Sequence, residues 1–235
     1  MTYCNRPRGR TFVAANQFRI GAWLNGWLAA ALLFGCAAAA LQAATAAAAP
    51  AAPTVLIVGD SLSAGYGLAA GQGWVDLLQR KLAAQGFEHK VVNASISGDT
   101  TAGGRSRINA ALQVHKPAVV VIELGGNDGL RGSALAAVKS NLDYMVESAQ
   151  KAGANVLVLG MQLPPNYGSK YIAEFSSLFR DVAKTRGTAL VPFLLQAFGD
   201  KPELFQADRI HPTAQAQPLM LEAIWPELKK LLPAR

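Results

Sequence analysis

The sequence predicts a single three-layer α/β domain, an α/β/α sandwich with a sheet of five parallel strands. Short runs of valine, isoleucine and leucine are continuous rather than alternating, which is typical of strands buried on both faces. Longer stretches with helical spacing separate these runs, as in parallel strands joined by right-handed crossover helices. About 190 residues follow an N-terminal leader, which is enough for one well-filled domain. No internal repeat or interdomain linker is recognisable after Pro53.

Strands and helices are expected to alternate along this domain. The strands are expected at Thr54–Val58, Lys90–Ala94, Ala118–Leu124, Asn155–Leu159 and Ala189–Val191. The helices between them are expected at Trp74–Gln85, Gly103–His115, Ser133–Ala152 and Tyr171–Thr185. In the first helix, Val75, Leu78 and Leu82 repeat at the spacing of one buried face.

A final helix is expected to follow Pro212 and to end near Leu232. Three of its apolar residues are expected to face the sheet: Leu219, Ala223 and Leu231. This helix would complete the layer of helices on one side of the sheet.

The first 46 residues have the pattern of a secretory signal peptide. Four arginines up to Arg19 precede an apolar run from Ile20 to Leu41, and Ala44-Thr45-Ala46 fits a small-x-small cleavage site. We therefore expect a signal peptide at 1–46, an Ala/Pro linker at 47–53 and the folded domain at 54–235, exported to the periplasm or secreted. The alternative is a retained anchor, because the apolar run is long enough to span a bilayer.

Both cysteines, Cys4 and Cys36, lie in this leader. A mature domain without cysteine excludes a thiol nucleophile, a disulfide scaffold and a zinc-cysteine site, and it suits an oxidising compartment. Leu33-Phe34-Gly35-Cys36 is similar to a bacterial lipoprotein box, so lipidation of Cys36 is the alternative to simple cleavage.

The charge of the chain is concentrated at its start. Loss of the leader removes four arginines and no acidic residue, which lowers the formal net charge from +7 to +3. No basic tract remains that is typical of a nucleic-acid interface, so we expect no nucleic-acid partner and no stable membrane partner after cleavage.

Four polar blocks follow predicted strands or precede the last helix. They are Gly59–Ser63, Asn93–Asp99, Glu123–Asp128 and Ala207–Pro212. Because the carboxyl ends of parallel strands meet at one edge of a sheet, the first three blocks are expected to lie close together. Ser61 does little for packing at such a position, and we interpret it as a nucleophile.

A serine nucleophile needs a base, and His211 is the best placed of three histidines. Asp208 lies three residues before it, close enough for its carboxylate to orient the ring and stabilise an imidazolium. The alternative is an Asp208 that caps the last helix beside a surface histidine. His89 and His115 have polar neighbours and are expected to be exposed.

The developing oxyanion needs fixed hydrogen-bond donors. The backbone N–H groups of Ser61 and Gly98 and the side-chain amide of Asn127 are the candidates, since each lies in one of the polar blocks. Loss of one such donor typically costs roughly 100- to 1000-fold in rate. Ordinary turns at Gly98 and Asn127 are the alternative interpretation.

These blocks together resemble those of the SGNH (GDSL-type) hydrolase family, over essentially all of Thr54–Leu232. The matching residues are Ser61, Gly98, Asn127 and His211, with Asp208 in the D-x-x-H block. The resemblance implies a flavodoxin-like strand order of 2-1-3-4-5, no metal or other cofactor, and an open site.

The stretch Met161–Gly168 resembles the loop after strand four in the exported bacterial branch of arylesterases, lysophospholipases and acyl-CoA thioesterases. The family implies that Asp60 orders the nucleophile turn, and Asp128 is expected to hold the Asn127 loop through bonds to its own turn. An apolar acyl groove is expected to involve Tyr66, Leu163, Pro164, Tyr167 and Ile210. The predicted function is a serine esterase acting on small-molecule esters or thioesters through an acyl-enzyme, by default as a monomer.

Other function classes fit less well. Gly65–Ala70 matches G-x-G-x-x-A, but it starts six residues after the strand instead of opening a helix there. Asp208 and His211 are too few for a catalytic zinc, which usually has three protein ligands. A carbohydrate O-deacetylase on the same fold and a non-catalytic binding protein remain the alternatives.

Overall fold

The computed structural model describes residues 52–233. The predicted signal peptide, its cleavage site and Cys36 lie outside the described residues. Within residues 52–233, no helix has the length and apolar character needed to cross a membrane.

The sheet has five parallel strands in the order β2-β1-β3-β4-β5, which confirms the expected topology. The strands are β1 (Thr54–Gly59), β2 (Lys90–Asn93), β3 (Val119–Glu123), β4 (Asn155–Leu159) and β5 (Ala189–Val191). The register pairs Gly59, the last residue of β1, with Glu123, the last residue of β3. The ends of these two strands therefore lie side by side at the carboxyl edge of the sheet.

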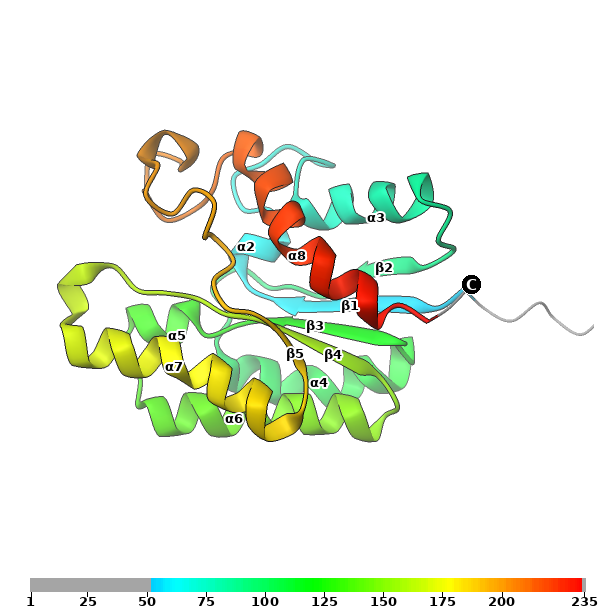
Figure 1. Cartoon of the computed structure of the whole chain (residues 1–235), viewed down its shortest axis with the longest axis horizontal. Coiled ribbons are helices and arrows are strands. Elements are labelled where there is room, and N and C mark those ends of the chain that lie inside the picture. The colour runs from blue at the N-terminus through cyan, green and yellow to red at the C-terminus, as the bar shows by residue number, and fades with distance from the viewer. Residues whose placement is uncertain (1–51, 234–235) are drawn as a thin grey trace, which may run out of the picture. The chain divides into compact units, whose positions relative to one another are not determined.

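Helices cover both faces of the sheet, which confirms the three layers (Figure 1). One face carries α3 (Trp74–Ala84) and α8 (Gln217–Leu231). The other carries α4 (Thr101–His115), α6 (Leu135–Lys151) and α7 (Ser169–Arg186). This covering on both faces explains why the strand sequences are continuously apolar.

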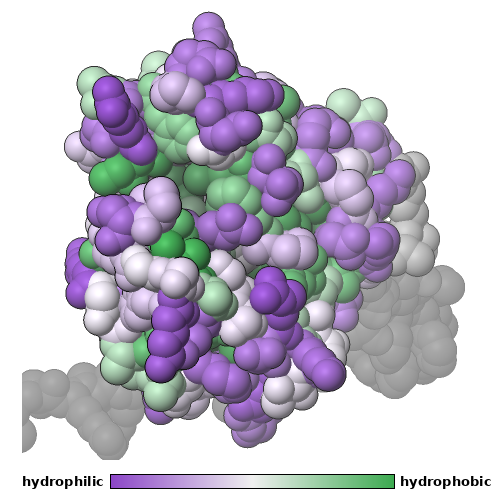
Figure 2. Space-filling model, turned by 60° about the vertical axis from the view of Figure 1, so that its left-hand side comes forward, coloured by the Kyte–Doolittle hydropathy of each residue, from purple (hydrophilic) through white to green (hydrophobic). Residues whose placement is uncertain are grey.

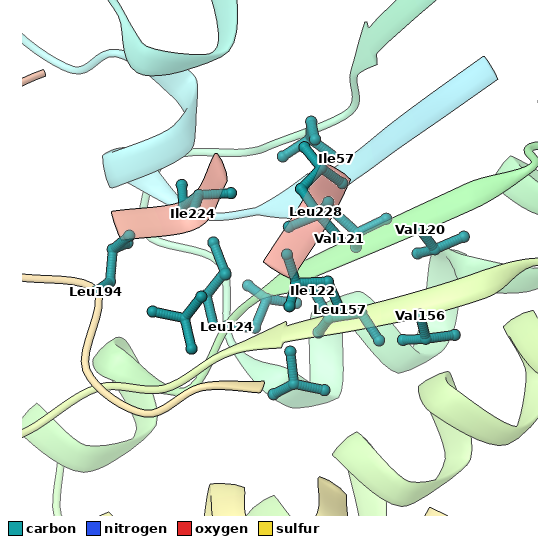
Figure 3. Close-up of a cluster of buried hydrophobic side chains, with 14 of the residues drawn as sticks. Ile57, Val120, Val121, Ile122, Leu124, Val156, Leu157, Leu194, Ile224 and Leu228 are labelled. Carbon is teal, nitrogen blue, oxygen red and sulfur yellow. The ribbon is translucent and has the colours of Figure 1, made fainter. Parts of the chain in front are cut away.

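The core lies between these layers. Figure 3 shows side chains from neighbouring strands, among them Ile57, Val121 and Leu157, beside Ile224 and Leu228 of α8. All five of these side chains are fully buried. A rigid, closely packed centre of this kind holds the strand ends, and so the residues that follow them, in fixed positions.

Several short elements were not expected from the sequence. They are α2 (Ser61–Ala64), α5 (Gly126–Leu130) and the 3₁₀ turns η2 (Pro165–Tyr167), η3 (Pro202–Leu204) and η4 (Ala214–Ala216). Elements of three to five residues are too short to show helical periodicity, which needs a window of about 11 residues or more. Three of them carry residues of the predicted site: Ser61 in α2, Asn127 in α5 and the groove residue Tyr167 in η2.

The last helix follows Pro212 and ends near Leu232, as expected, although η4 comes first and α8 begins at Gln217. The residues predicted to face the sheet lie at the margin of the buried face: Leu219 and Leu231 are partly buried and pack against the core, and Ala223 is partly buried. The buried centre of that face consists of Met220, Leu221, Ile224, Trp225 and Leu228. Because apolar residues flank this stripe on both sides, hydrophobic spacing alone did not determine the rotation of the helix.

The expectation that His89 is exposed is wrong. Its side chain is buried, with its ring 5.8 Å from that of Phe87, which in turn packs edge-on against Trp225 of α8. Burial lowers the pKa of His89, since the charged form is poorly solvated there. The polar neighbours of His89 in sequence did not reveal that α8 folds back over this region. His115 is half-buried at the end of α4.

Candidate active site

Ser61 is the first residue of α2, directly beyond the carboxyl end of β1. The Asp60 carboxylate caps this short helix by accepting a hydrogen bond of 3.0 Å from the Leu62 N–H. Gly59 permits the tight strand-to-helix turn, because a Cβ there would lie 2.8 Å from Oε2 of Glu123 and from the Ser63 side chain. The strand end, the glycine and the cap together determine where Ser61 is presented.

His211 lies 150 residues further along the chain, yet its Nε2 is 2.8 Å from Ser61 Oγ. Its Nδ1 is 2.6 Å from Oδ2 of Asp208. The other Asp208 oxygen accepts hydrogen bonds from the backbone N–H groups of Ile210 and His211, at 2.9 and 3.0 Å. One carboxylate therefore shapes the local turn and orients the imidazole ring.

These hydrogen bonds lower the pKa of Asp208 to about 2, first through the His211 backbone N–H and then through its ring. Asp208 is therefore ionised at neutral pH and accepts the Nδ1 proton of His211. Nε2 is then left as the acceptor for the Ser61 hydroxyl proton. The line Asp208–His211–Ser61 has the geometry needed to activate a serine.

The three predicted oxyanion donors come from three segments: Ser61 starts α2, Gly98 lies between β2 and α4, and Asn127 lies in α5. Gly98 has a φ of +77°, and no described atom lies within 4 Å of where its Cβ would be. Asn127, in α5, donates from Nδ2 to Oδ2 of Asp60 at 3.0 Å and to the carbonyl of Asp99 at 2.9 Å. The amide is thus held in place, and both of its hydrogens are used in the resting structure.

Arg107 was not identified from the sequence. Its guanidinium is 2.9 Å from Oδ2 of Asp99, and it also donates to the carbonyls of Ala94 and Gly59. It therefore joins the loop that carries Gly98 to the end of β1. An arginine inside a predicted helix carries no local signal of such contacts.

Asp128 holds its loop through a distant partner. Its Oδ2 accepts a hydrogen bond from the Thr101 N–H at 2.8 Å, and its Oδ1 accepts one from the Thr101 hydroxyl at 2.7 Å. The expectation of side-chain bonds to its own turn is therefore wrong. Asp128 instead ties α5 to the N-terminus of α4, because the two elements meet at the sheet edge.

Glu123 is the second residue that was not assigned a role from the sequence. It is fully buried, and its Oε2 accepts hydrogen bonds from the Asp60 N–H at 3.2 Å and the Ser63 hydroxyl at 2.8 Å. Burial raises its pKa well above the ordinary value, and the charge of Asp60 raises that pKa further. Burial also raises the pKa of Asp60 to about 6. The only signal in the sequence is a carboxylate at the end of an otherwise apolar strand.

A cavity of about 670 Å³ lies at this edge of the sheet. Figure 2, which turns the edge forward, shows apolar side chains in a hollow bordered by polar ones. Three of the expected groove residues line the cavity: Leu163, Pro164 and Ile210. Its other lining residues include Leu130, Met161, Pro165, Phe193, Leu195, Phe205 and Arg209.

Two of the expected groove residues have other contacts. The Tyr66 ring lies 4.4 Å from the His211 ring, centroid to centroid, so it packs on the base. The Tyr167 hydroxyl donates to the Leu130 carbonyl at 2.9 Å, and neither tyrosine is among the residues that line the cavity. Tyr167 thereby joins the loop after β4 to α5.

No group of three or more His, Cys, Asp or Glu side chains within residues 52–233 is placed to hold a metal ion.

Comparison with known proteins gives consistent matches. The sequence profile of the GDSL-like lipase/acylhydrolase family matches residues 57–218. Esterase TesA of Pseudomonas aeruginosa is 55% identical over 205 residues, which cover 87% of this chain and 100% of that protein. Thioesterase 1/protease 1/lysophospholipase L1 of Escherichia coli is 41% identical over 182 residues, covering 77% of this chain and 86% of that protein.

Solved structures of esterases also match the structure of this chain. A crystal structure of TesA has a TM-score of 0.75 and 57% identity, and covers 76% of this chain and 99% of that one. The esterase EstA from Pseudoalteromonas sp., in a structure inhibited by monoethylphosphonate, has a TM-score of 0.72 and 40% identity. That match covers 75% of this chain and 97% of the other.

Proposed function

The chain belongs to the GDSL-like lipase/acylhydrolase family and is a serine esterase, and we propose that Ser61, His211 and Asp208 carry out the reaction. The observation that supports this assignment most directly is the pair of short contacts of His211, 2.8 Å to Ser61 Oγ and 2.6 Å to Asp208. The line of hydrogen bonds runs from a carboxylate through an imidazole to a serine hydroxyl, which is the arrangement that activates a hydroxyl.

In the first half of the reaction, His211 Nε2 accepts the Ser61 proton while Ser61 Oγ forms a bond to the carbonyl carbon of the substrate. The carbonyl π electrons move to oxygen, which becomes the oxyanion. As the tetrahedral intermediate collapses, the bond to the leaving group breaks, and the imidazolium of His211 protonates the departing alcohol or thiol. Ionised Asp208 stabilises that imidazolium.

The oxyanion is proposed to accept hydrogen bonds from the N–H groups of Ser61 and Gly98 and from the amide of Asn127. Because both Nδ2 hydrogens of Asn127 already have acceptors, one must be shared with the oxyanion or released from Asp60 or Asp99. A donor held by two acceptors stays oriented between turnovers, which lowers the reorganisation needed when charge develops.

In the second half, water replaces the alcohol or thiol. His211 accepts a proton from water, the hydroxide oxygen bonds to the acyl carbon, and the Ser61 oxygen leaves and takes the proton back from His211. The products are a carboxylic acid and the free enzyme.

For the substrate, we propose an ester or thioester whose acyl chain enters the apolar cavity. The relatives named above are an esterase and a thioesterase/lysophospholipase, and the cavity is lined in large part by apolar side chains such as Leu163, Phe193 and Ile210. Its volume of about 670 Å³ lies in the range of small-molecule sites. A carbohydrate acetyl ester would leave most of this apolar lining unused.

The test is hydrolysis of p-nitrophenyl esters from C2 to C16 by mature protein beginning near Ala47, beside Ser61→Ala and with and without EDTA. We expect activity to survive EDTA, to vanish with Ser61→Ala, and to be highest for acyl chains longer than acetyl. A matched pair of variants shows where the acyl chain of the substrate binds: Leu163→Ala lies in the cavity, and Val114→Ala lies on the exposed end of α4. Only Leu163→Ala should change the dependence of activity on acyl-chain length. A C2 optimum would contradict acyl binding in the cavity.

We further propose that the protein is exported and works as a monomer. The leader pattern at 1–46 supports export, and the complete set Ser61, His211 and Asp208 within one chain supports the monomer. Light scattering of the mature protein at several concentrations tests the second point, since a dimer mass that persists on dilution would contradict it.

A further inference from the structure

The carboxyl group of Glu123 lies directly beneath the turn that carries Ser61. Glu123 pairs in register with Gly59, and a Cβ at Gly59 would lie only 2.8 Å from its Oε2. The side chain is fully buried although it ends a strand whose other residues are all apolar. An ionisable group in this place needs a reason, because burying a charge without a partner is costly.

The two oxygens of Glu123 are used unequally. Oε2 accepts hydrogen bonds from the Asp60 N–H and from the Ser63 hydroxyl, whereas Oε1 is buried and receives no hydrogen bond from a donor within the described part of the chain. Two donors on one oxygen fit a carbonyl with two lone pairs. An Oε1 that receives no donor fits the hydroxyl of a neutral acid. Besides burial, which raises both pKa values, the side-chain hydrogen bond between Glu123 and Asp60 raises the pKa of Glu123 further and lowers that of Asp60.

We propose that Glu123 is a positioning residue for ester hydrolysis, a buried neutral acid whose carbonyl oxygen fixes the turn from Asp60 to Ser63 and thereby the position of Ser61. This inference rests on the proposed role of Ser61. The same turn positions Asp60, whose Oδ2 accepts the Asn127 amide at 3.0 Å. One buried group therefore supports both the nucleophile and a proposed oxyanion donor.

The surroundings of Glu123 agree with the neutral form. Burial raises its pKa, and the nearby carboxyl of Asp60 raises it further. The charge of His211 acts in the opposite direction on the pKa of Asp60, which favours the negative charge on Asp60 rather than on Glu123. The pair therefore holds its proton on the more deeply buried member.

The experiment compares Glu123→Gln, Glu123→Ala and a matched core variant, Val156→Ala in β4, for kcat and KM on a p-nitrophenyl ester. The rate at which a fluorophosphonate probe labels Ser61 is measured in parallel. Gln keeps a carbonyl for the two donors and carries no charge, so we expect it to retain kcat within about threefold. Ala leaves both donors unpaired, and displacement of the nucleophile by about 1 Å typically costs about 100-fold.

For Glu123→Ala we therefore expect kcat and the labelling rate to fall by roughly 100-fold with KM within about threefold, because Glu123 does not line the cavity. Val156→Ala removes fully apolar contacts and should lose stability without this loss of kcat. Folded Glu123→Ala with near-normal kcat would overturn the positioning role. Equal losses for Gln and Ala would overturn the neutral acid. If the probe labels Ser61→Ala as fast as the wild type, the proposed role of Ser61 itself would be contradicted.

A second measurement decides the case if Glu123→Ala does not fold. The native protein keeps the Glu123 proton above pH 4.5, the ordinary value, whereas the unfolded chain releases it. The stability of wild type should therefore decline relative to Glu123→Gln as pH rises above 4.5. Parallel curves of unfolding free energy against pH for the two proteins would overturn the neutral acid.

Discussion

At the scale of single residues, Asp208 does two things with two oxygens. Oδ1 accepts the backbone N–H groups of Ile210 and His211, and Oδ2 faces the His211 ring. The turn also places Arg209 at a φ of +58°, a conformation that a non-glycine residue adopts only when its surroundings favour it. The bonds to Asp208 help to hold this strained turn and, with it, the base.

Replacement of His211 by alanine should cost more than replacement of Asp208 by asparagine. Loss of the base typically removes about 10⁶-fold in kcat, whereas loss of the orienting carboxylate removes roughly 10⁴-fold. The new side chain in Asp208→Asn would also present an amide N–H to Nδ1, which favours the wrong tautomer of His211. Steady-state kcat on one ester, with both variants checked for native circular dichroism, measures the difference. Equal losses would contradict the division of roles between the two residues.

Gly59 is expected to tolerate no side chain. A Cβ would lie 2.8 Å from Glu123 Oε2 and from the Ser63 side chain, so Gly59→Ala must move the turn that carries Ser61. We expect kcat to fall at least tenfold and the free energy of unfolding to fall by about 1–3 kcal/mol, as for an overpacked core. Kinetics and urea unfolding measure the two effects.

The matched control is Gly73→Ala. There the nearest atom to the new Cβ is 3.4 Å away, and the backbone φ is −66°. This variant should change neither kcat nor stability by a comparable amount. Similar losses in both variants would show that the close approach at Gly59 is not the cause.

At the scale of elements, the site depends on helices that begin at the sheet edge. Ser61 starts α2, Asn127 lies in the first turn of α5, and Thr101 starts α4. The Asp128–Thr101 pair joins the last two, and Arg107 joins α4 to the end of β1. The relative positions of the proposed nucleophile and oxyanion donors are thus set by bonds between elements.

Thr101→Val tests the contact between α4 and α5. The side chains have nearly the same shape, but valine leaves the Asp128 Oδ1 without its hydroxyl donor, and Asp128 is buried. We expect a loss of about 1–3 kcal/mol in unfolding free energy. Thr213→Val is the control, since the Thr213 hydroxyl is buried and has no hydrogen-bond partner among residues 52–233. Urea unfolding that shows equal effects at the two sites would contradict the importance of this bond.

At the scale of the whole molecule, export remains a prediction from the leader. Expression of the full chain in a bacterial host should give a shortened protein in the periplasm, with an N-terminus near Ala47 by mass spectrometry. Cys36→Ser should leave this product unchanged if the leader is simply cleaved. A product that begins at Cys36 and carries lipid would contradict cleavage near Ala46.

Features of the molecule that depend on short stretches of sequence could be predicted, and features that depend on distant contacts could not. The five strands, their helices and the polar blocks were predictable because each depends on short stretches of sequence, and the tertiary fold then brings Ser61 and His211 within 2.8 Å. The expectations that differ from the structure concern the burial of His89, the partner of Asp128 and the centre of the buried face of α8. Each of these depends on which distant element packs against it.

The sequence by itself determined the fold class, the strand order through the family resemblance, and the residue types able to perform acyl transfer. Hydrophobic periodicity and short motifs are local, so they survive in a linear chain. Only the tertiary structure decided that Glu123 lies beneath Ser61, that Arg107 holds the Gly98 loop and that the cavity opens beside Ile210. Those facts arise from strand register and close packing between residues far apart in sequence, and a long-range contact leaves no mark on the sequence around it.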